Sequence, residues 1–181
     1  EITRFWPLPE RFSFFGIDTF GYSGRVLLPI TIKREDTKID VQSDFNFTGE
    51  LNALVCSDLC VPISGPLSLS LPKGNATPTV FAQEIAYARA QVPTQVTGPD
   101  IEIKSIGLMP EDRKIVIELS APDQILKDAF IETKLAGYSF SKPDIVDKSH
   151  NIIVAEININ GVQDAGALLG QDLILTIVSK E

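Results

Sequence analysis

The sequence predicts an all-β protein made of two immunoglobulin-like β-sandwich domains joined by a short helix and a linker. Two observations support this fold class. Short runs of alternating or β-branched apolar residues recur along most of the chain, and convincing helical periodicity occurs once, after residue 77. The expected boundaries are 1–76 for the first domain, 77–99 for the helix and linker, and 100–181 for the second domain.

Length and composition are those of an ordinary globular protein. The 181 residues are 44% hydrophobic and 22% charged, which suffices for one large domain or two small ones. The net charge of -8 and the lack of a basic stripe argue against a nucleic-acid partner. No apolar run reaches membrane-helix length and no signal-peptide pattern occurs, so we expect a soluble piece of a mature or trimmed chain.

The first region combines an irregular start with several strands. Residues 1 to 24 are rich in aromatics and broken by proline and glycine, which predicts loop with one short strand. Strand patterns follow in four runs, at 25–33, 39–51, 51–56 and 65–72. The two cysteines, Cys56 and Cys60, therefore fall at a turn between strands.

One helix and a second group of strands complete the chain. Thr77 is the expected N-cap, Pro78 the first helical residue and Pro93 the stop, followed by a linker at 94–99. Residues 164 to 172 suit a helical turn or a loop. Strand patterns lie at 101–108, 114–121, 130–140, 151–160 and 173–180.

The cysteine pair is the strongest chemical feature. Four steps of extended strand span about 13 Å, whereas a disulfide needs Cα atoms roughly 4.4 to 6.8 Å apart. If Cys56 and Cys60 bond, residues 57 to 59 must fold back as a tight turn. So small a ring adds only about 2 kcal/mol in the chain-entropy model. Reactivity explains the pair more easily than stability, although a structural staple stays open.

Other chemistry has less support. A zinc site needs four ligands, and the remaining candidates, His150 and Met109, lie in the second strand region. We therefore predict no metal site and no organic cofactor. Asp58, between the cysteines, suits pKa tuning or proton relay at a thiol, and equally suits a turn residue that caps its own backbone.

The segment "DTFGYSG" at 18–24 is the second candidate feature. Phe20 and Tyr22 lie between glycines, as in a mobile flap that covers something apolar or reactive. The alternative, two core aromatics at the edge of a sandwich, is equally compatible with the sequence.

Several motifs together resemble a known family. "IDTFGYSGRVLLPITIK" followed by "FNFTGELNALVCSDLCVPISGPLSLSLP" is similar to the N-terminal periplasmic domain of the DsbD-type membrane thiol-disulfide reductases. The nearer branch is the suppressor-of-copper-sensitivity (ScsB) type, in which a "WPxPxRF" segment precedes a "CxDxCxP" turn. Here the segment is "FWPLPERF" at 5–12, and the turn is formed by Cys56, Asp58, Cys60 and Pro62. The resemblance covers residues 5 to 72 by motif and the rest by layout, and the DsbD domain has more residues between its cysteines.

The resemblance implies a redox role. Cys56 and Cys60 would alternate between dithiol and disulfide, with Cys60 forming mixed disulfides and Cys56 resolving them. Asp18, Phe20 and Tyr22 would belong to a cap loop that shields the pair. Further residues usually precede the first motif, so we expect the first domain to be truncated at its N-terminus.

The same resemblance implies partners and a location. Electrons would come from the transmembrane and thioredoxin-like domains of the same full-length protein, and would pass to periplasmic thioredoxin-fold proteins of disulfide isomerase or reductase type. The chain would be a soluble periplasmic region of an inner-membrane protein. Two other functions stay open: a Cu(I)-binding copper-tolerance module that uses both thiolates, and a noncatalytic adhesion or scaffold module with an incidental disulfide.

Overall fold

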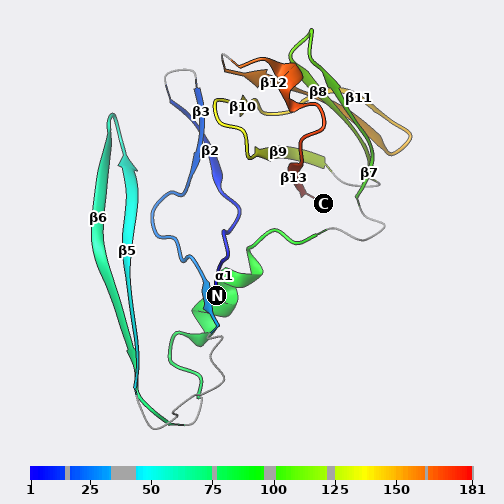
Figure 1. Cartoon of the computed structure of the whole chain (residues 1–181). Coiled ribbons are helices and arrows are strands. Elements are labelled where there is room, and N and C mark those ends of the chain that lie inside the picture. The colour runs from blue at the N-terminus through cyan, green and yellow to red at the C-terminus, as the bar shows by residue number, and fades with distance from the viewer. Residues whose placement is uncertain are drawn as a thin grey trace. The chain divides into compact units, whose positions relative to one another are not determined.

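The computed structural model describes residues 1–14, 17–33, 44–74, 77–95, 101–121, 125–161 and 163–180. Almost all of the regular structure in these residues is β-strand (Figure 1), which confirms the all-β prediction. Within the described residues, no helix is long and apolar enough to cross a lipid bilayer.

Contacts divide the chain into two compact units. The first unit consists of Glu1–Phe5 and Pro29–Ala90, and the second consists of Trp6–Leu28 and Gln91–Glu181. This grouping differs from a simple division along the sequence, because an N-terminal segment packs with the C-terminal strands. The domain boundaries at residues 76 and 99 stay a prediction.

The second unit contains a β-sandwich. In the larger sheet β12 lies between β8 on one side and β10 and β11 on the other, and β7 forms the edge beside β8. The smaller sheet pairs β9 with β13, and all of these pairs are antiparallel. The strands are β7 (Glu102–Met109), β8 (Lys114–Ser120), β9 (Ile125–Thr133), β10 (Ser139–Phe140), β11 (Asp144–Ser149), β12 (Ile152–Asn160) and β13 (Leu173–Lys180).

Alternation along β8 and β12 builds the core of this unit. Every second residue points inward, so that Ile115, Ile117, Ile153 and Ile157 are at most 1% exposed. The 3-10 turn η1 (Ala165–Leu168) and strand β9 contribute to the same cluster. Side chains from both sheets thus share one hydrophobic core, which is the physical basis of a sandwich.

Four strands of this unit, β7, β8, β12 and β13, agree with the predicted runs to within a residue. β9 begins at Ile125 rather than at residue 130. β11 was not predicted, because its residues are exposed and lack an apolar alternation; its pairing with β12 creates the strand. Residues 165 to 168 form a helical turn, as one of the two alternatives stated.

A hairpin of β2 (Glu10–Phe14) and β3 (Ile17–Gly21) also belongs to the second unit. The prediction of irregular loop for this segment was wrong in part. Strand β1 (Ile2–Arg4) was missed as well; it pairs with β4 (Ile30–Ile32) in the first unit. Proline and glycine obscured the strand pattern here, and cross-strand and tertiary contacts supply what local propensity does not.

Arg11 of β2 attaches this hairpin to the sandwich. Its guanidinium binds Asp128 through two hydrogen bonds of 3.0 Å, and Asp18 through one of 2.9 Å. It also donates to the carbonyl oxygens of Phe140 at 2.8 Å and Ala129 at 2.9 Å. All five N–H donors of the guanidinium are thereby used.

The surroundings of Arg11 strengthen these bonds. Its side chain is only 10% exposed, and its guanidinium carbon lies 4.8 Å from the ring centre of Phe20 and 5.3 Å from that of Phe130. The two rings meet edge to face at 5.3 Å. A planar guanidinium fits between these carboxylates, carbonyl oxygens and aromatic faces, whereas the ammonium group of a lysine does not.

The first unit contains a helix, a small sheet and a long hairpin. Helix α1 (Ala82–Ala90) begins five residues after the expected N-cap, Thr77. Thr79 takes the place of Thr77, because its hydroxyl oxygen accepts from the Phe81 amide at 3.3 Å and its carbonyl accepts from the Ala82 amide at 3.0 Å. Near the helix end, the Arg89 guanidinium lies 3.5 Å from the centre of the Phe5 ring, beside the β1 and β4 pair.

We predict that Arg11→Lys lowers the free energy of unfolding of the second unit by about 2 kcal/mol. A lysine ammonium has only three donors and lacks the planar, bidentate geometry of a guanidinium. Some buried acceptors that are now bound to Arg11 therefore lose their partners. Urea unfolding followed by the fluorescence of Trp6, the single tryptophan, reports on this unit.

Lys104→Ala provides the matched control. Lys104 pairs with Glu102 at 2.6 Å on the surface of β7, where it is 42% exposed. Its loss should change the unfolding free energy by less than about 0.5 kcal/mol. Equal midpoints for the two variants would contradict the role given to Arg11.

Candidate functional site: a disulfide at a hairpin tip

Two long strands carry the cysteines to the end of a two-stranded ribbon. β5 (Phe45–Cys56) and β6 (Cys60–Leu71) pair antiparallel over their whole length. Figure 1 shows them as a narrow hairpin within the first unit. The register begins at Phe45 opposite Leu71 and ends at Cys56 opposite Cys60. The last pair of the ladder is therefore the cysteine pair.

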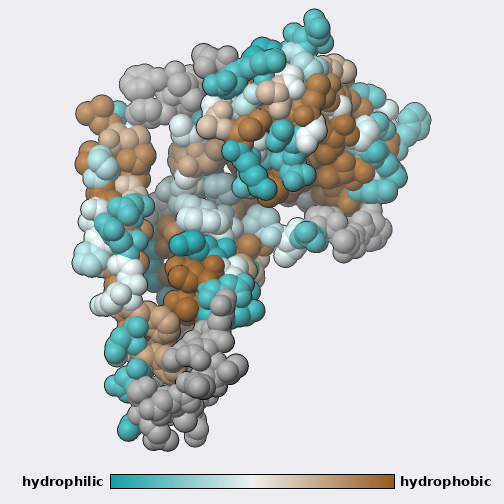
Figure 2. All heavy atoms as spheres, viewed as in Figure 1, coloured by the Kyte–Doolittle hydropathy of each residue, from teal (hydrophilic) through white to brown (hydrophobic). Residues whose placement is uncertain are grey.

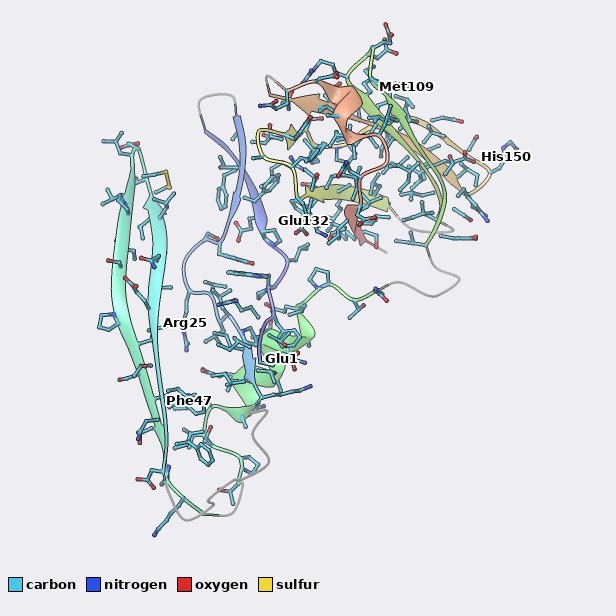
Figure 3. All side chains as sticks on the ribbon, in the orientation of Figure 1. Glu1, Arg25, Phe47, Met109, Glu132 and His150 are labelled. Carbon is cyan, nitrogen blue, oxygen red and sulfur yellow. A yellow bond between two sulfur atoms is a disulfide. The ribbon has the colours of Figure 1, made fainter. Side chains whose placement is uncertain are left out.

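Cys56 and Cys60 form a disulfide. The sulfur atoms are 2.08 Å apart, and the Cα atoms are 4.0 Å apart, slightly closer than is usual for a disulfide. Residues 57 to 59 turn back between them, and the Ser57 amide donates to the Leu59 carbonyl oxygen at 3.1 Å. Figure 3 shows the sulfur atoms next to this turn. The tight turn that the spacing requires is thus present.

The ribbon has one apolar face and one mixed face. Side chains directly opposite one another in an antiparallel pair point to the same side, and successive residues alternate. One face consequently carries only apolar residues and glycine. Its cross-strand pairs are Phe45 with Leu71, Phe47 with Leu69, Gly49 with Leu67, Leu51 with Gly65, Ala53 with Ile63, and Val55 with Val61.

The disulfide lies on the other face. That face is polar along most of the ribbon, with pairs such as Asn46 with Ser70 and Asn52 with Ser64. Next to the cysteines it changes character, because Leu54 lies opposite Pro62. A shallow depression lined by residues 52–54 and 62–64 lies beside this pair. The disulfide therefore has an apolar neighbour pair on its own face.

The tip as a whole is open to solvent. Both cysteines are exposed, and so are the apolar side chains around them: Leu54 is 67% exposed and Leu59 is 76% exposed. Figure 2 shows hydrophobic residues gathered at this end of the ribbon. An exposed disulfide is accessible to an attacking thiolate, and access is one of the conditions for exchange.

Asp58 lies in the turn between the cysteines and is exposed. Among the described residues its carboxylate has no hydrogen bond or ion pair. The alternative of a turn residue that caps its own backbone therefore has no hydrogen bond to support it. The tuning of a thiol by Asp58 stays a prediction.

The three predicted cap residues lie in the second unit. Asp18 and Phe20 lie on strand β3 rather than in a loop, and both contact Arg11. Tyr22 follows the strand; its hydroxyl donates to the Pro7 carbonyl oxygen at 2.8 Å, and burial raises the pKa of this phenol. The disulfide belongs to the first unit. Shielding of the disulfide by Phe20 stays a prediction.

The donor set of the tip is limited to the two sulfur atoms and one carboxylate. Among the described residues, no group of three or more His, Cys, Asp or Glu side chains is arranged to hold a metal ion. His150 lies in the turn between β11 and β12, in the other unit, with a backbone φ of 51°. It is a turn residue of the second unit.

Sequence reasoning missed two groups of residues. Leu54 and Leu59 lie near the disulfide but were not singled out, and Pro62 was named only as part of the cysteine motif. Counting residues outward from the two cysteines gives the pairing of Leu54 with Pro62. Arg11 was part of a quoted motif, yet nothing in the local sequence indicated Asp128 as its partner. The first signal was present in the sequence, and the second requires the fold.

The site has one chemical capability that follows directly from its geometry. A thiolate can attack one sulfur of the disulfide, form a mixed disulfide and release the other cysteine as a thiolate. A second thiol then completes a two-electron reduction of the pair. The reverse sequence passes two electrons from the dithiol to another disulfide.

Comparison with known proteins places these features in context. Residues 2–72 match the family model "Thiol:disulfide interchange protein DsbD, N-terminal". Nearly the whole chain also resembles the crystal structure of the N-terminal periplasmic domain of ScsB from Proteus mirabilis. The TM-score is 0.66 at 22% identity, and the match covers 99% of this chain and 70% of that one. No curated protein sequence matches significantly.

The matched segment contains the ribbon, the disulfide and the β2–β3 hairpin. At 22% identity the structural likeness is evidence for the fold, whereas the family match rests on sequence. Together with the close cysteine pair, they support a thiol-disulfide redox module. Residues 2–72 are similar to a DsbD-type N-terminal domain, the family that the sequence motifs resemble.

Proposed function

We propose that this chain is the electron-transfer module of a membrane-anchored protein-disulfide reductase. The observation that carries the proposal is the exposed disulfide between directly opposite residues at a hairpin tip, within the segment that matches the DsbD family. The pair would cycle between dithiol and disulfide. No organic cofactor takes part in this chemistry.

The two cysteines have different roles in this proposal. Cys60 is the sulfur that forms mixed disulfides, and Cys56 resolves them by attacking Cys60. The ring of five residues keeps Cys56 near Cys60 after the bond opens, which favours a rapid intramolecular resolving step. The exposed side chains of Leu54 and Leu59 offer an apolar contact area around Cys60.

The partners are proposed from the same resemblance. Periplasmic thioredoxin-fold proteins of the disulfide isomerase or reductase type would accept the electrons. Transmembrane and thioredoxin-like domains of the same full-length protein would supply them. The similar ScsB structure is described as an N-terminal periplasmic domain, which supports a periplasmic location for this chain.

Trapping tests the roles of the cysteines. Cys56→Ala should accumulate a mixed disulfide between Cys60 and a thioredoxin-fold protein, because no resolving thiol remains, whereas Cys60→Ala should not. Non-reducing electrophoresis followed by mass spectrometry of the adduct measures the yield. Equal yields from the two variants would refute the assignment.

The reduction potential separates a redox pair from an incidental structural bond. We expect a potential above about -300 mV in glutathione or dithiothreitol redox buffers, since structural disulfides lie below that value. A lower potential would favour the adhesion or scaffold alternative.

The shielding proposed for Phe20 makes a separate prediction. Phe20→Ala should raise the rate at which iodoacetamide alkylates the reduced cysteines, because a cap that lacks its aromatic ring covers them less. Phe12→Ala is the matched control, since Phe12 lies on the opposite face of the same hairpin and is also exposed. An unchanged rate in Phe20→Ala, with unfolding midpoints showing an intact second unit, counts against shielding.

Copper binding stays an alternative to be tested directly. Two reduced thiolates at one hairpin tip are soft ligands that suit Cu(I). Competition with a Cu(I) chelator, for the reduced protein and for Cys56→Ala, measures the affinity. Sub-micromolar binding that is lost in the variant would favour a copper module.

A further inference from the structure

The ribbon that carries the disulfide has charges of only one sign. Residues 44 to 72 include Asp44, Glu50 and Asp58, and no lysine, arginine or histidine. Asp44 lies at the base, where its carboxylate accepts from the amide of Lys73 at 2.9 Å. Glu50 lies midway, and Asp58 lies in the turn itself.

Distance makes Asp58 the dominant charge of the ribbon at the disulfide. Asp58 is two residues from each cysteine, so its Cα atom lies at most about 7 Å from the Cα atoms of Cys56 and Cys60. Glu50 is six strand residues from Cys56, about 20 Å, and Lys73 lies about 40 Å along the ribbon from the tip. At physiological ionic strength the Debye length is about 8 Å, so among ribbon charges only Asp58 acts there with appreciable strength.

The Asp58 charge is not offset locally. The carboxylate has no ion pair or hydrogen bond among the described residues, and the other side chains of the tip are apolar or uncharged. Ser57, Leu59 and Val61 are exposed there, beside Leu54 and Pro62. A reacting molecule therefore meets an apolar surface with a single negative charge beside the sulfur.

We propose that the hairpin tip selects, through Asp58, protein partners whose reactive sulfur lies in electropositive, apolar-edged surroundings. The inference rests on the proposed function and adds the chemistry of the partner. Charge complementarity of this kind acts mainly on the rate of productive encounter and on the choice among partners. A partner with an acidic reactive site is disfavoured by the same carboxylate.

The chemical step is thiol-disulfide exchange. The Cys60 thiolate attacks one sulfur of a partner disulfide, RSSR, and the S–S bond of the partner breaks. The products are the mixed disulfide Cys60–S–S–R and the leaving thiolate RS⁻. The Cys56 thiolate then attacks Cys60, which forms the Cys56–Cys60 bond, releases the second RS⁻ and leaves the cysteine pair oxidised by two electrons.

Small charged disulfides test this proposal without an identified partner. The protein is used with Cys56→Ala, so that no resolving thiolate attacks Cys60 and the mixed disulfide accumulates. Rates of modification of Cys60 are measured by mass spectrometry with cationic cystamine and with anionic 3,3′-dithiodipropionate. The ratio of the two rates cancels the thiolate fraction of Cys60, because both probes react with the same thiolate.

Asp58→Asn is expected to reduce the cystamine-to-dithiodipropionate ratio about fivefold at low ionic strength, since one charge at about 7 Å in water changes each rate roughly two- to threefold. Comparing ratios between variants also cancels the intrinsic reactivity of the probes. In 0.5 M salt the difference should shrink below about twofold. Asp58→Lys should reverse the preference.

Glu50→Gln is the matched control. It removes a charge of the same sign from the same ribbon, on the face that carries the disulfide, but at about 20 Å from Cys56. It should change the ratio by less than about 1.5-fold. An equal effect of Asp58→Asn and Glu50→Gln, or no effect of either, would overturn the proposal.

The neutral probe 2-hydroxyethyl disulfide distinguishes the failure of this inference from the failure of the proposed function. Measurable reaction with the neutral probe and no dependence on Asp58 overturn the inference alone. No reaction of Cys60 with any of the three disulfides overturns the proposed function, and the inference with it.

Discussion

Cys56 and Cys60 can bond because the antiparallel ladder of β5 and β6 ends with these two residues directly opposite each other. The same ladder also decides which side chains share a face of the ribbon with the disulfide. Because side chains alternate along each strand, it assigns the disulfide to one face, together with Leu54 and Pro62, and assigns a continuous apolar surface to the other. A shift of the register by one residue would separate the sulfur atoms and exchange the two faces.

This arrangement explains why a five-residue ring suits redox chemistry better than stabilisation. A ring this small removes little conformational entropy from the unfolded chain, so the disulfide adds little to the stability of strands that the hydrogen-bonded ladder already joins. At the same time it lies at the exposed end of a narrow ribbon, where few side chains hinder an incoming thiolate. Low structural importance and high accessibility are the properties expected of a bond that is repeatedly opened and closed.

The second unit shows a different physical principle. Its N-terminal hairpin is held by Arg11, whose five donors are all used by two carboxylates and two carbonyl oxygens between aromatic rings. Such a buried, bidentate pair costs desolvation energy and is strongly destabilising when broken, so it specifies one position for the hairpin. A motif that resembles part of the redox family thereby serves as a structural anchor in this fold.

Alternation and turn residues alone predicted the all-β class, four of the C-terminal strands and the turn at the cysteines, because these follow from local side-chain direction. They also indicated a close cysteine pair by spacing.

The sequence did not indicate that the "FWPLPERF" segment packs against Asp128 and Phe130, nor that polar β11 pairs with β12. The first outcome depends on contacts between residues more than 100 positions apart, and the second depends on a neighbouring strand. Local propensity depends on neither kind of contact and cannot predict them. The sequence by itself thus determined which residues can react, and the tertiary structure decided what surrounds them, since neighbours in space are set by the pairing of distant segments.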